Sequence, residues 1–309
     1  MTLLSRLDPK KKQKVVLNLW CWGFLSITLI FYIFFQGWPI ISSVIYSFMD
    51  WSGMTNEKAF VGLANYKELF QDKTYWNAFK NSFEFSVLNV PFTLFISLLL
   101  AYILNDAALK ARSVYRTIFF LPVVTTASIV GIVMIFIFGA TGPINWVITH
   151  LSHTKALGFL TNQKYAMYTV VAISVWKDCG TYMIYWIAGL QSVPRDMYEA
   201  ASIDGASSAR MFFKIVMPLM APIAGIITVL CCINSLKVFD LVKTMTEGGP
   251  FYSTDVVGTF VYRTAFSSEV GLPRLGYASS GAILFGVTVI AIVCILDIVK
   301  NRLQESRNI

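Results

Sequence analysis

The sequence predicts an all-α membrane protein with six transmembrane helices, folded as a single domain over residues 1–309. Hydrophobic residues make up 56% of the chain and charged residues only 14%, which is too apolar for an ordinary soluble domain. Six apolar runs are about 20 residues long, the length that a helix needs to cross about 30 Å of hydrocarbon. They cover residues 15–35, 83–104, 118–138, 166–190, 212–235 and 282–299.

The positions of the lysines and arginines predict the orientation, because basic residues are retained on the cytoplasmic side of a membrane. They occur in the tail at 1–14, after the second run, after the fourth run and at the C-terminus. Both termini are therefore expected in the cytoplasm, and the segment 40–80 is expected outside. This topology explains the net charge of +8. No nucleic-acid partner is expected, because the basic residues are spread among loops in a chain surrounded by lipid.

The first run is expected to be a retained helix, because it is longer than a signal-peptide core and ends without a small-x-small cleavage site. The outer segment contains the string FVGLANY at 60–66, followed by a predicted amphipathic interfacial helix at 67–79. The five cysteines all lie in predicted spans, without the spacing of a disulfide framework or a zinc site. His150 and His153 are expected to be solvated loop residues rather than metal ligands.

The third run has Pro122 in its first turns, followed by Thr125 and Thr126. Proline within a membrane helix frees a carbonyl group and produces a kink. Hydroxyl groups beside such a kink can line a solute path. They can equally bond to their own helix or to neighbouring helices.

The fourth run carries Lys177 and Asp178 near its middle. Charges there cost several kcal/mol unless they are partnered or hydrated. Adjacent residues on a helix diverge by about 100°, so the two are not expected to pair with each other. Each is expected to meet another helix, water or a solute. Trp176 offers an aromatic plane on which a sugar ring can stack, or it simply packs.

The fifth run ends in four polar residues, which complete the set expected to face a solute. Lys237 and Asp240 are three positions apart, so a local salt bridge between them is one alternative. Asn234 and Ser235 have no evident local partner. The complete expected solute path is Thr125, Thr126, Trp176, Lys177, Asp178, Asn234, Ser235, Lys237 and Asp240.

A polar segment rich in small residues separates the fourth and fifth runs. It contains Glu199-Ala200-Ala201 and Asp204-Gly205-Ala206, followed by Phe212, Ile215, Pro218 and Pro222. This spacing resembles the EAA loop by which permease subunits of bacterial ABC importers dock on their ATPase. Together with the string at 60–66, Arg116 with Pro122 and the loop at 247–254, it makes the whole chain resemble a carbohydrate permease of the maltose-importer type.

The resemblance implies a type I ABC importer permease fold in the bacterial inner membrane. It implies four kinds of partner: a second homologous permease, two copies of a cytoplasmic ATPase, an extracytoplasmic solute-binding protein and an oligosaccharide. The segment 191–214, continued to Pro222, would couple to the ATPase through Glu199, whose carboxylate suits a partner arginine, and through small residues that permit close approach. Gly205 is expected to separate two short helices. The implied coupling residues are Glu199, Ala200, Ala201, Asp204, Gly205, Ala206, Phe212, Ile215 and Pro218.

In the maltose-type family, solute-facing positions lie on the third, fourth and fifth spans. The resemblance carries them to positions near Val123, Ala127, Lys177, Asp178, Cys231, Ser235, Lys237 and Val238. The resemblance implies a sugar or oligosaccharide as the cargo. Lysines at two of these positions can hold a carboxylate or sulfate, so acidic cargoes, such as uronate-containing oligosaccharides, are included in this expectation.

The chain has no G-x-x-x-x-G-K-[ST] phosphate loop, so ATP and Mg²⁺ are expected in the partner ATPase and no cofactor on this chain. No catalytic residues are expected. Two alternatives stay open. One is an ion-coupled secondary transporter that uses Lys177 and Asp178 as a relay. The other is a structural membrane anchor, in which the polar residues of the fourth and fifth runs would tolerate alanine.

Overall fold

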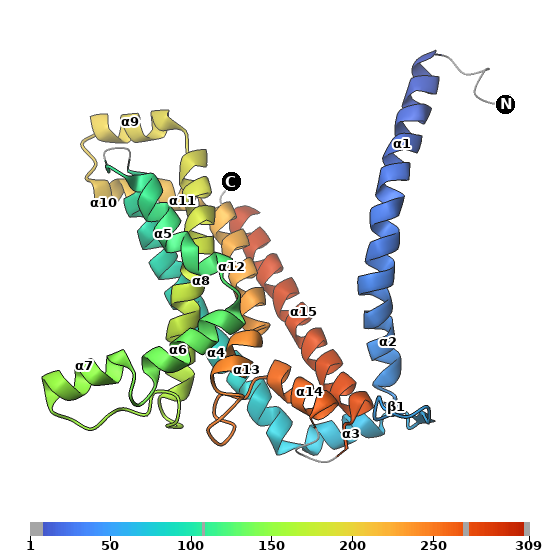
Figure 1. The fold of residues 1–309 in the computed structure, drawn as a ribbon. Coiled ribbons are helices and arrows are strands. Elements are labelled where there is room, and N and C mark those ends of the chain that lie inside the picture. Colours follow the sequence, from blue (N-terminus) through green and yellow to red (C-terminus); the bar gives the residue numbers. More distant parts are fainter. Residues whose placement is uncertain (1–8, 107–108, 268–271, 306–309) are drawn as a thin grey trace.

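The computed structural model describes residues 9–106, 109–267 and 272–305, and most of these residues are helical, as the composition predicts (Figure 1). A short antiparallel hairpin pairs β1 (Met49–Asp50) with β2 (Ala59–Phe60). The helices are, in order, α1 (Pro9–Tyr32), η2 (Ile33–Gly37), α2 (Trp38–Tyr46), α3 (Ala64–Gln71), α4 (Lys73–Asn105), α5 (Arg112–Val124), α6 (Ala127–Phe138), α7 (Pro143–Ser152), α8 (Ala166–Ser192), α9 (Arg195–Ile203), α10 (Ser208–Met211), η3 (Phe212–Val216), α11 (Met217–Leu219), α12 (Ala221–Leu236), α13 (Asp240–Met245), α14 (Val257–Phe266) and α15 (Leu275–Glu305).

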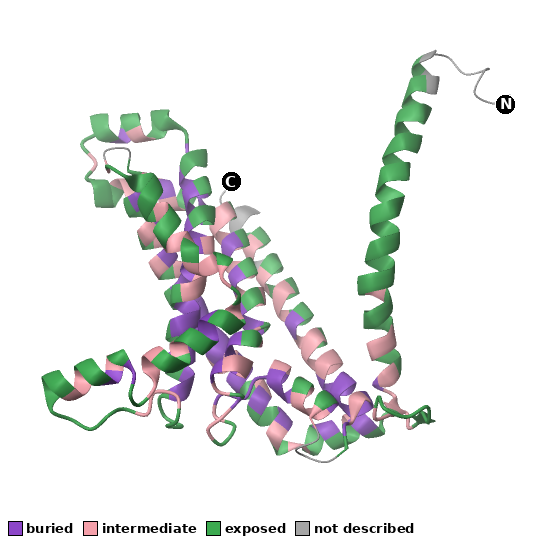
Figure 2. Cartoon of the chain, viewed as in Figure 1, coloured by how far each residue is buried: buried purple, intermediate pink, exposed green. Residues whose placement is uncertain are grey.

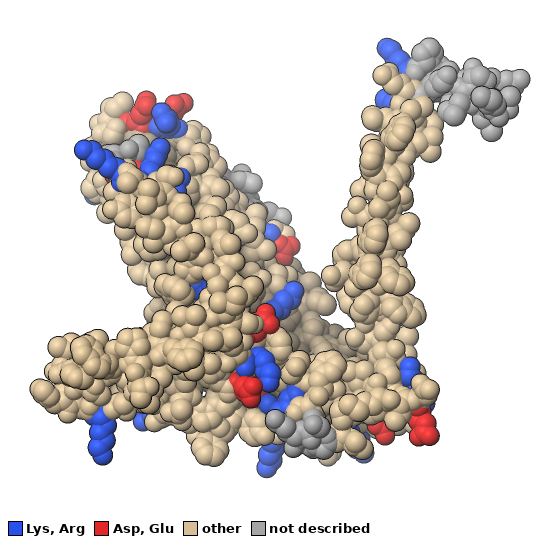
Figure 3. Space-filling view, in the orientation of Figure 1, with Lys and Arg blue, Asp and Glu red and all other residues tan. Residues whose placement is uncertain are grey.

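Five helical stretches in the described part of the chain are long and apolar enough to cross a membrane. They are Gln13–Tyr46, Lys73–Asn105, Ala127–Ser152, Ala221–Met245 and Leu275–Arg302. Charged atoms gather at the two ends of the molecule, and smaller groups of acidic and basic atoms are visible between the ends (Figure 3). Helix α8 is not among the five, although its 27 residues span about 40 Å at about 1.5 Å per residue. The multi-pass character is confirmed, whereas the count of six spans and the orientation of the termini stay predictions.

Helix α8 lies at the centre of the bundle and supplies much of its core (Figure 2). It packs against α4, α5, α12 and α13. Buried side chains occur along its whole length, from Ala166 and Val170 to Met183 and Trp186. Because most of α8 is buried against other helices, its buried side tolerates polar groups that a lipid-facing surface would not. Helix α2 packs on α15, whereas α1 stands apart from the bundle (Figure 1).

The close approach of α8 to α5 depends on Gly180. A Cβ atom there would collide with the carbonyl oxygen of Phe119 and lie 3.1 Å from the Cα of Phe120. We expect Gly180→Ala to lower the free energy of unfolding by roughly 1–3 kcal/mol, because backbone atoms must shift to relieve the overlap. Thermal unfolding in detergent measures this. Gly286→Ala is the control, because a Cβ there meets no atom within 4 Å. Equal stability of the two variants would contradict this account.

The predicted third span over 118–138, with a kink near Pro122, is divided into two helices. Helix α5 ends at Val124, and the extended backbone of Thr125 precedes a new helix. The Oγ1 atom of Thr126 accepts a hydrogen bond from the amide of Ile129 at 3.5 Å and caps α6. Pro122 lies within α5 and has no amide hydrogen to donate, so the predicted kink becomes a complete break at the two threonines.

The predicted interfacial helix at 67–79 is also wrong. Helix α3 ends at Gln71, and α4 begins at once. The chain turns at Asp72, whose backbone is extended and whose Oδ1 atom accepts hydrogen bonds from the amides of Thr74 at 2.7 Å and Tyr75 at 3.4 Å. An aspartate in this position starts a new helix. Of the predicted tail at 1–14, residues 1–8 lie outside the described part, and α1 begins at Pro9.

Polar contacts fix the end of the bundle that carries α3 and α14. Asp255 is completely buried. Its carboxylate accepts hydrogen bonds from both terminal nitrogens of Arg263, at 3.1 and 2.7 Å, and from the hydroxyl of Thr259 at 2.7 Å. A second bidentate pair joins Arg274 to Glu68 at 2.6 and 2.7 Å. That pair is exposed, and the hydrogen bond from Arg274 lowers the pKa of Glu68 below its usual value.

Candidate functional site

Helices α9 and α10 form a helix-turn-helix at one end of the bundle (Figure 1). Gly205 lies in the turn with a φ of +70°, a conformation that glycine adopts without strain. The amide of Gly205 donates to the carbonyl of Ser202 at 3.1 Å, and the amide of Ala206 donates to the carbonyl of Ala201 at 3.0 Å. This pair of bonds is a Schellman motif, which ends α9. Gly205 thus separates two short helices, as the sequence predicts.

The chain that leaves the turn does not form one continuous fifth span from residue 212. Ser207 caps α10 by accepting a hydrogen bond from the amide of Arg210 at 3.4 Å. The π-helix η3 and the short α11 follow, and α12 begins only at Ala221. Pro218 and Pro222 lie in the first turns of α11 and α12, where a proline fits because no amide hydrogen is needed there.

The predicted coupling residues differ in their exposure. Glu199, Ala200, Asp204, Gly205 and Pro218 are exposed. Ala206, Phe212 and Ile215 are half-buried and Ala201 is buried, so they join the segment to the bundle. Among the described residues, neither Glu199 nor Asp204 forms an ion pair. The outer surface of α9 therefore offers two carboxylates next to small side chains.

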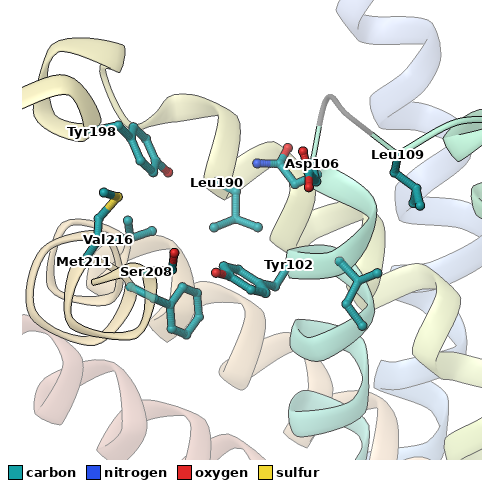
Figure 4. A pocket seen from close by; sticks show the side chains of 11 residues that line it. Tyr102, Asp106, Leu109, Leu190, Tyr198, Ser208, Met211 and Val216 are labelled. Atoms are coloured by element: carbon teal, nitrogen blue, oxygen red, sulfur yellow. The ribbon is translucent and has the colours of Figure 1, made fainter. Parts of the chain in front are cut away.

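A cavity of about 630 Å³ lies under α9 and α10, between them and the ends of α4 and α8 (Figure 4). Tyr198 of α9 and Tyr102 of α4 point into it, and partial burial raises the pKa of Tyr198. The ring of Phe212 meets that of Tyr102 edge-on, with centroids 4.8 Å apart. The segment therefore contacts the bundle through a few side chains around a hollow. The lining is Tyr102, Ile103, Asn105, Asp106, Leu109, Leu190, Tyr198, Ser208, Met211, Phe212 and Val216.

In the predicted solute path, Lys177 and Asp178 pair with each other, contrary to expectation. The Nζ atom of Lys177 lies 3.1 Å from Oδ1 of Asp178. The Cβ atoms diverge around the helix, but the four-carbon stem of lysine is flexible enough to bring its ammonium group back to its neighbour. The hydroxyl of Ser174 also donates to Asp178, at 3.4 Å. The side chain of Lys177 is 15% exposed and that of Asp178 is 39% exposed.

Other predicted path residues have varied surroundings. Trp176 is 47% exposed. Thr125 and Thr126 lie in the break between α5 and α6, half-buried and exposed respectively. The side-chain amide of Asn234 donates to the hydroxyl of Tyr182 at 3.0 Å and joins α12 to α8. Ser235 is 5% exposed, and its hydroxyl has no hydrogen-bond partner among the described residues.

The alternative of a local salt bridge between Lys237 and Asp240 is wrong. Helix α12 ends at Leu236 and α13 begins at Asp240, so the two residues do not share a helix face. Both are exposed, and the described residues contain no ion pair between them. Lys237 lines a mostly apolar cavity of about 600 Å³ between α12, α14 and α15, in which it is the single charged residue. Lys177 does not line that cavity.

Sequence reasoning missed three tyrosines at these sites. Tyr182 follows Asp178 by one helical turn, so the spacing of four could have indicated it. Tyr102 and Tyr198 come together only through the packing of α9 over the end of α4, and no local pattern predicts that. In the described part of the chain, no group of three or more His, Cys, Asp or Glu residues is arranged to hold a metal ion. The ring of His150 lies on that of Trp146 in α7.

Comparison with known proteins identifies the family that this chain belongs to. Residues 93–307 match the family model described as binding-protein-dependent transport system inner membrane component. The chain belongs to this family. A family member, the probable ABC transporter permease protein YesP of Bacillus subtilis (strain 168), is 33% identical over 295 residues, which cover 94% of this chain and 93% of YesP. The predicted resemblance to ABC importer permeases and the inner-membrane location are thereby confirmed.

A further relative agrees with the family assignment, and a solved structure shares the fold. The probable starch degradation products transport system permease protein AmyD of Thermoanaerobacterium thermosulfurigenes is 30% identical over 297 residues, covering 96% of this chain and 98% of AmyD. The crystal structure of a bacterial ABC transporter involved in the import of the acidic polysaccharide alginate contains a chain with the same fold. The two chains superpose with a TM-score of 0.81 and are 23% identical in sequence. The match covers 95% of this chain and 99% of the chain in that structure.

Proposed function

We propose that this family member is the permease subunit of an ATP-driven importer of sugars or oligosaccharides. It would form the translocation path with a second, homologous permease. Two copies of a cytoplasmic ATPase would supply the energy, and an extracytoplasmic binding protein would deliver the solute. The observation that carries the proposal is the exposed helix-turn-helix of α9 and α10, in a chain that belongs to a binding-protein-dependent family.

The α9–α10 segment has the features that an ATPase contact requires. Its exposed carboxylates, Glu199 and Asp204, are available to basic groups of a partner. The exposed small residues Ala200 and Gly205 let another backbone approach closely. Phe212 packs on the bundle and contacts Tyr102 of α4, and η3 and α11 connect α10 to α12, so a displacement of α9 and α10 would reach α12 through them. The proposal puts the segment and both termini in the cytoplasm, and the distribution of basic residues supports that orientation.

The identity of the cargo rests on chemistry and on the relatives. AmyD is named for starch degradation products and the solved neighbour for alginate, so a sugar or oligosaccharide is the cargo class that we propose. Within that class, we infer an acidic oligosaccharide. Lys177 is already paired with Asp178, whereas Lys237 has no ion-pair partner among the described residues. Lys237 is therefore the stronger candidate for a solute carboxylate.

Lys237→Gln is expected to reduce uptake of an acidic oligosaccharide by roughly tenfold or more, because a hydrogen bond to a charged group contributes about 1.5–3 kcal/mol. Uptake of labelled uronate oligosaccharides and of neutral maltooligosaccharides would be measured side by side. Lys73→Gln is the control, because Lys73 is exposed at the first turn of α4. Unchanged uptake of every acidic glycan by the Lys237→Gln and Lys177→Gln variants would contradict the proposal of an acidic cargo. It would leave the importer proposal intact.

Purification tests the proposed assembly. When the chain is expressed with the permease, ATPase and binding-protein genes that neighbour its own, we expect one complex containing both permeases and two ATPase copies. Recovery of the chain alone, with the ATPase in the soluble fraction, would contradict the proposal. Glycan-degrading enzymes among the neighbouring genes would narrow the cargo.

A further inference from the structure

Residues 139–165, here called the α7 arm, project sideways from the bundle. They connect α6 to α8 and include α7, which lies crosswise to α8 at the end of the bundle opposite α9 and α10 (Figure 1). On the orientation in the proposed function, this is the outer end. Nothing in the proposed transport cycle uses the arm.

Hydrogen bonds and a ring contact give the α7 arm a defined structure. Asn145 is completely buried. Its side-chain amide donates to the carbonyl oxygens of Gly139 and Leu157, each at 2.9 Å, and its Oδ1 atom accepts from the amide of Leu157 at 2.7 Å. The ring of Phe159 packs edge-on against Phe138, with centroids 5.5 Å apart. These contacts fold the segment after α7 back onto the start of the helix and hold its outer face in place.

That outer face of α7 is apolar. Trp146 is 60% exposed, Val147 43% and Leu151 78%. Val147 and Leu151 are four positions apart and share one side of the helix, and Trp146 lies on the adjoining side, where its ring contacts that of His150. Helix α6 continues the same character, with Phe136 exposed by 74%. The stretch Ala127–Ser152 is apolar enough to enter a membrane, and only 17% of its most apolar part is buried. Exposed apolar side chains therefore occur on both α6 and α7 of this candidate span, with the exposed Thr141 in the turn between the two helices.

The charge of the α7 arm has one sign. Lys155 and Lys164 are its charged residues, accompanied by His150 and His153, and no aspartate or glutamate occurs between residues 139 and 176. Both lysines are exposed, and neither forms an ion pair among the described residues. On the face shown in Figure 3, basic atoms and no acidic atoms project from the arm.

We propose that the α7 arm binds anionic phospholipid in the outer leaflet. The apolar face of α7 rests at the boundary between headgroups and acyl chains, as interfacial amphipathic helices do. Trp146 lies at the headgroup level, the place that membrane proteins favour for tryptophan, and Lys155 and Lys164 bind lipid phosphates. The exposed apolar side chains of α6 favour lipid over a protein partner, because α6 and α7 belong to the same candidate span. Only the assignment to the outer leaflet rests on the orientation given in the proposed function.

Two measurements on the full chain in nanodiscs test the proposal. A spin label at Leu151→Cys, with the native cysteines replaced, is expected to be more accessible to oxygen and less accessible to a water-soluble nickel complex than a label at Glu57→Cys. Glu57 lies in the exposed loop between β1 and β2. In native mass spectrometry, the chain is expected to retain phosphatidylglycerol over phosphatidylcholine, and Lys155→Gln with Lys164→Gln is expected to reduce that preference by about fivefold per lysine.

The control for charge is the double variant Lys73→Gln with Lys80→Gln, two exposed lysines of α4, which should keep the preference. A label at position 151 as accessible to the nickel complex as the one at position 57 would overturn the proposal. Shielding of position 151 from both reagents would also overturn it, and would indicate a protein partner or a second copy of the chain. Neither readout uses ATP or solute, so failure here would leave the importer proposal standing.

Discussion

Replacement of Glu199 by lysine is expected to reduce solute uptake, and ATP hydrolysis stimulated by solute, by at least about tenfold. Glu199 is exposed on α9 and has no ion-pair partner among the described residues, so its replacement leaves the fold unchanged. In the proposed complex, a basic group of the ATPase donates a hydrogen bond to this carboxylate. Losing such a charge-assisted bond would cost about 1.5–3 kcal/mol, and the new positive charge would repel the basic group. Uptake by cells that express the complete importer measures the effect.

The control for this variant is Glu57→Lys, which makes the same charge change on the exposed hairpin loop at the other end of the molecule. Immunoblots of membranes would show that both variants accumulate like the wild type. We expect Glu57→Lys to transport normally. Normal uptake by Glu199→Lys at equal abundance would show that α9 does not couple to the ATPase through this carboxylate.

The largest stability effect is expected at Asp255. Asp255→Ala leaves the guanidinium of Arg263, whose side chain is 17% exposed, without its partner. Breaking a buried pair in this way costs about 3–5 kcal/mol. By contrast, Glu68→Ala breaks the exposed pair with Arg274 and should cost about 0–1 kcal/mol. Thermal unfolding of the purified variants in detergent compares the two directly.

A double variant separates the loss of the ion pair from general damage to the fold. Adding Arg263→Met to Asp255→Ala removes the unpaired charge, and we expect it to restore part of the lost stability. Similar unfolding temperatures for Asp255→Ala and Glu68→Ala would mean that the burial of Asp255 does not control the stability of this end of the bundle.

The long spans could be predicted from sequence because their apolar runs are local. The predicted spans at 83–104 and 282–299 lie inside α4 and α15. The breaks could not be predicted from hydropathy, because they depend on capping. Thr126 starts α6 within an otherwise apolar run, and Asp72 starts α4 where an amphipathic pattern continued. At both places one side chain that accepts hydrogen bonds from backbone amides decides where the helix begins.

In the candidate sites too, local features could be predicted from the sequence and tertiary contacts could not. Glycine and small residues in fixed spacing predicted the turn at Gly205, because its positive φ is a local requirement. The pairing of Lys177 with Asp178 was missed because helix geometry fixes the direction of Cβ and not that of a flexible ammonium group. The cavity between Tyr102 and Tyr198 depends on the docking of α9 over α4, a tertiary contact between residues far apart in the sequence.

Uptake by proteoliposomes that contain both permeases and the ATPase tests the central claim most directly. Labelled oligosaccharide and binding protein would be supplied outside, with ATP and Mg²⁺ inside. We predict that solute accumulates only when ATP and binding protein are both present, and that dissipating the proton gradient leaves the rate unchanged. Accumulation by this chain without ATP, driven by a proton or ion gradient, would contradict the account and would favour a secondary transporter that uses Lys177 and Asp178.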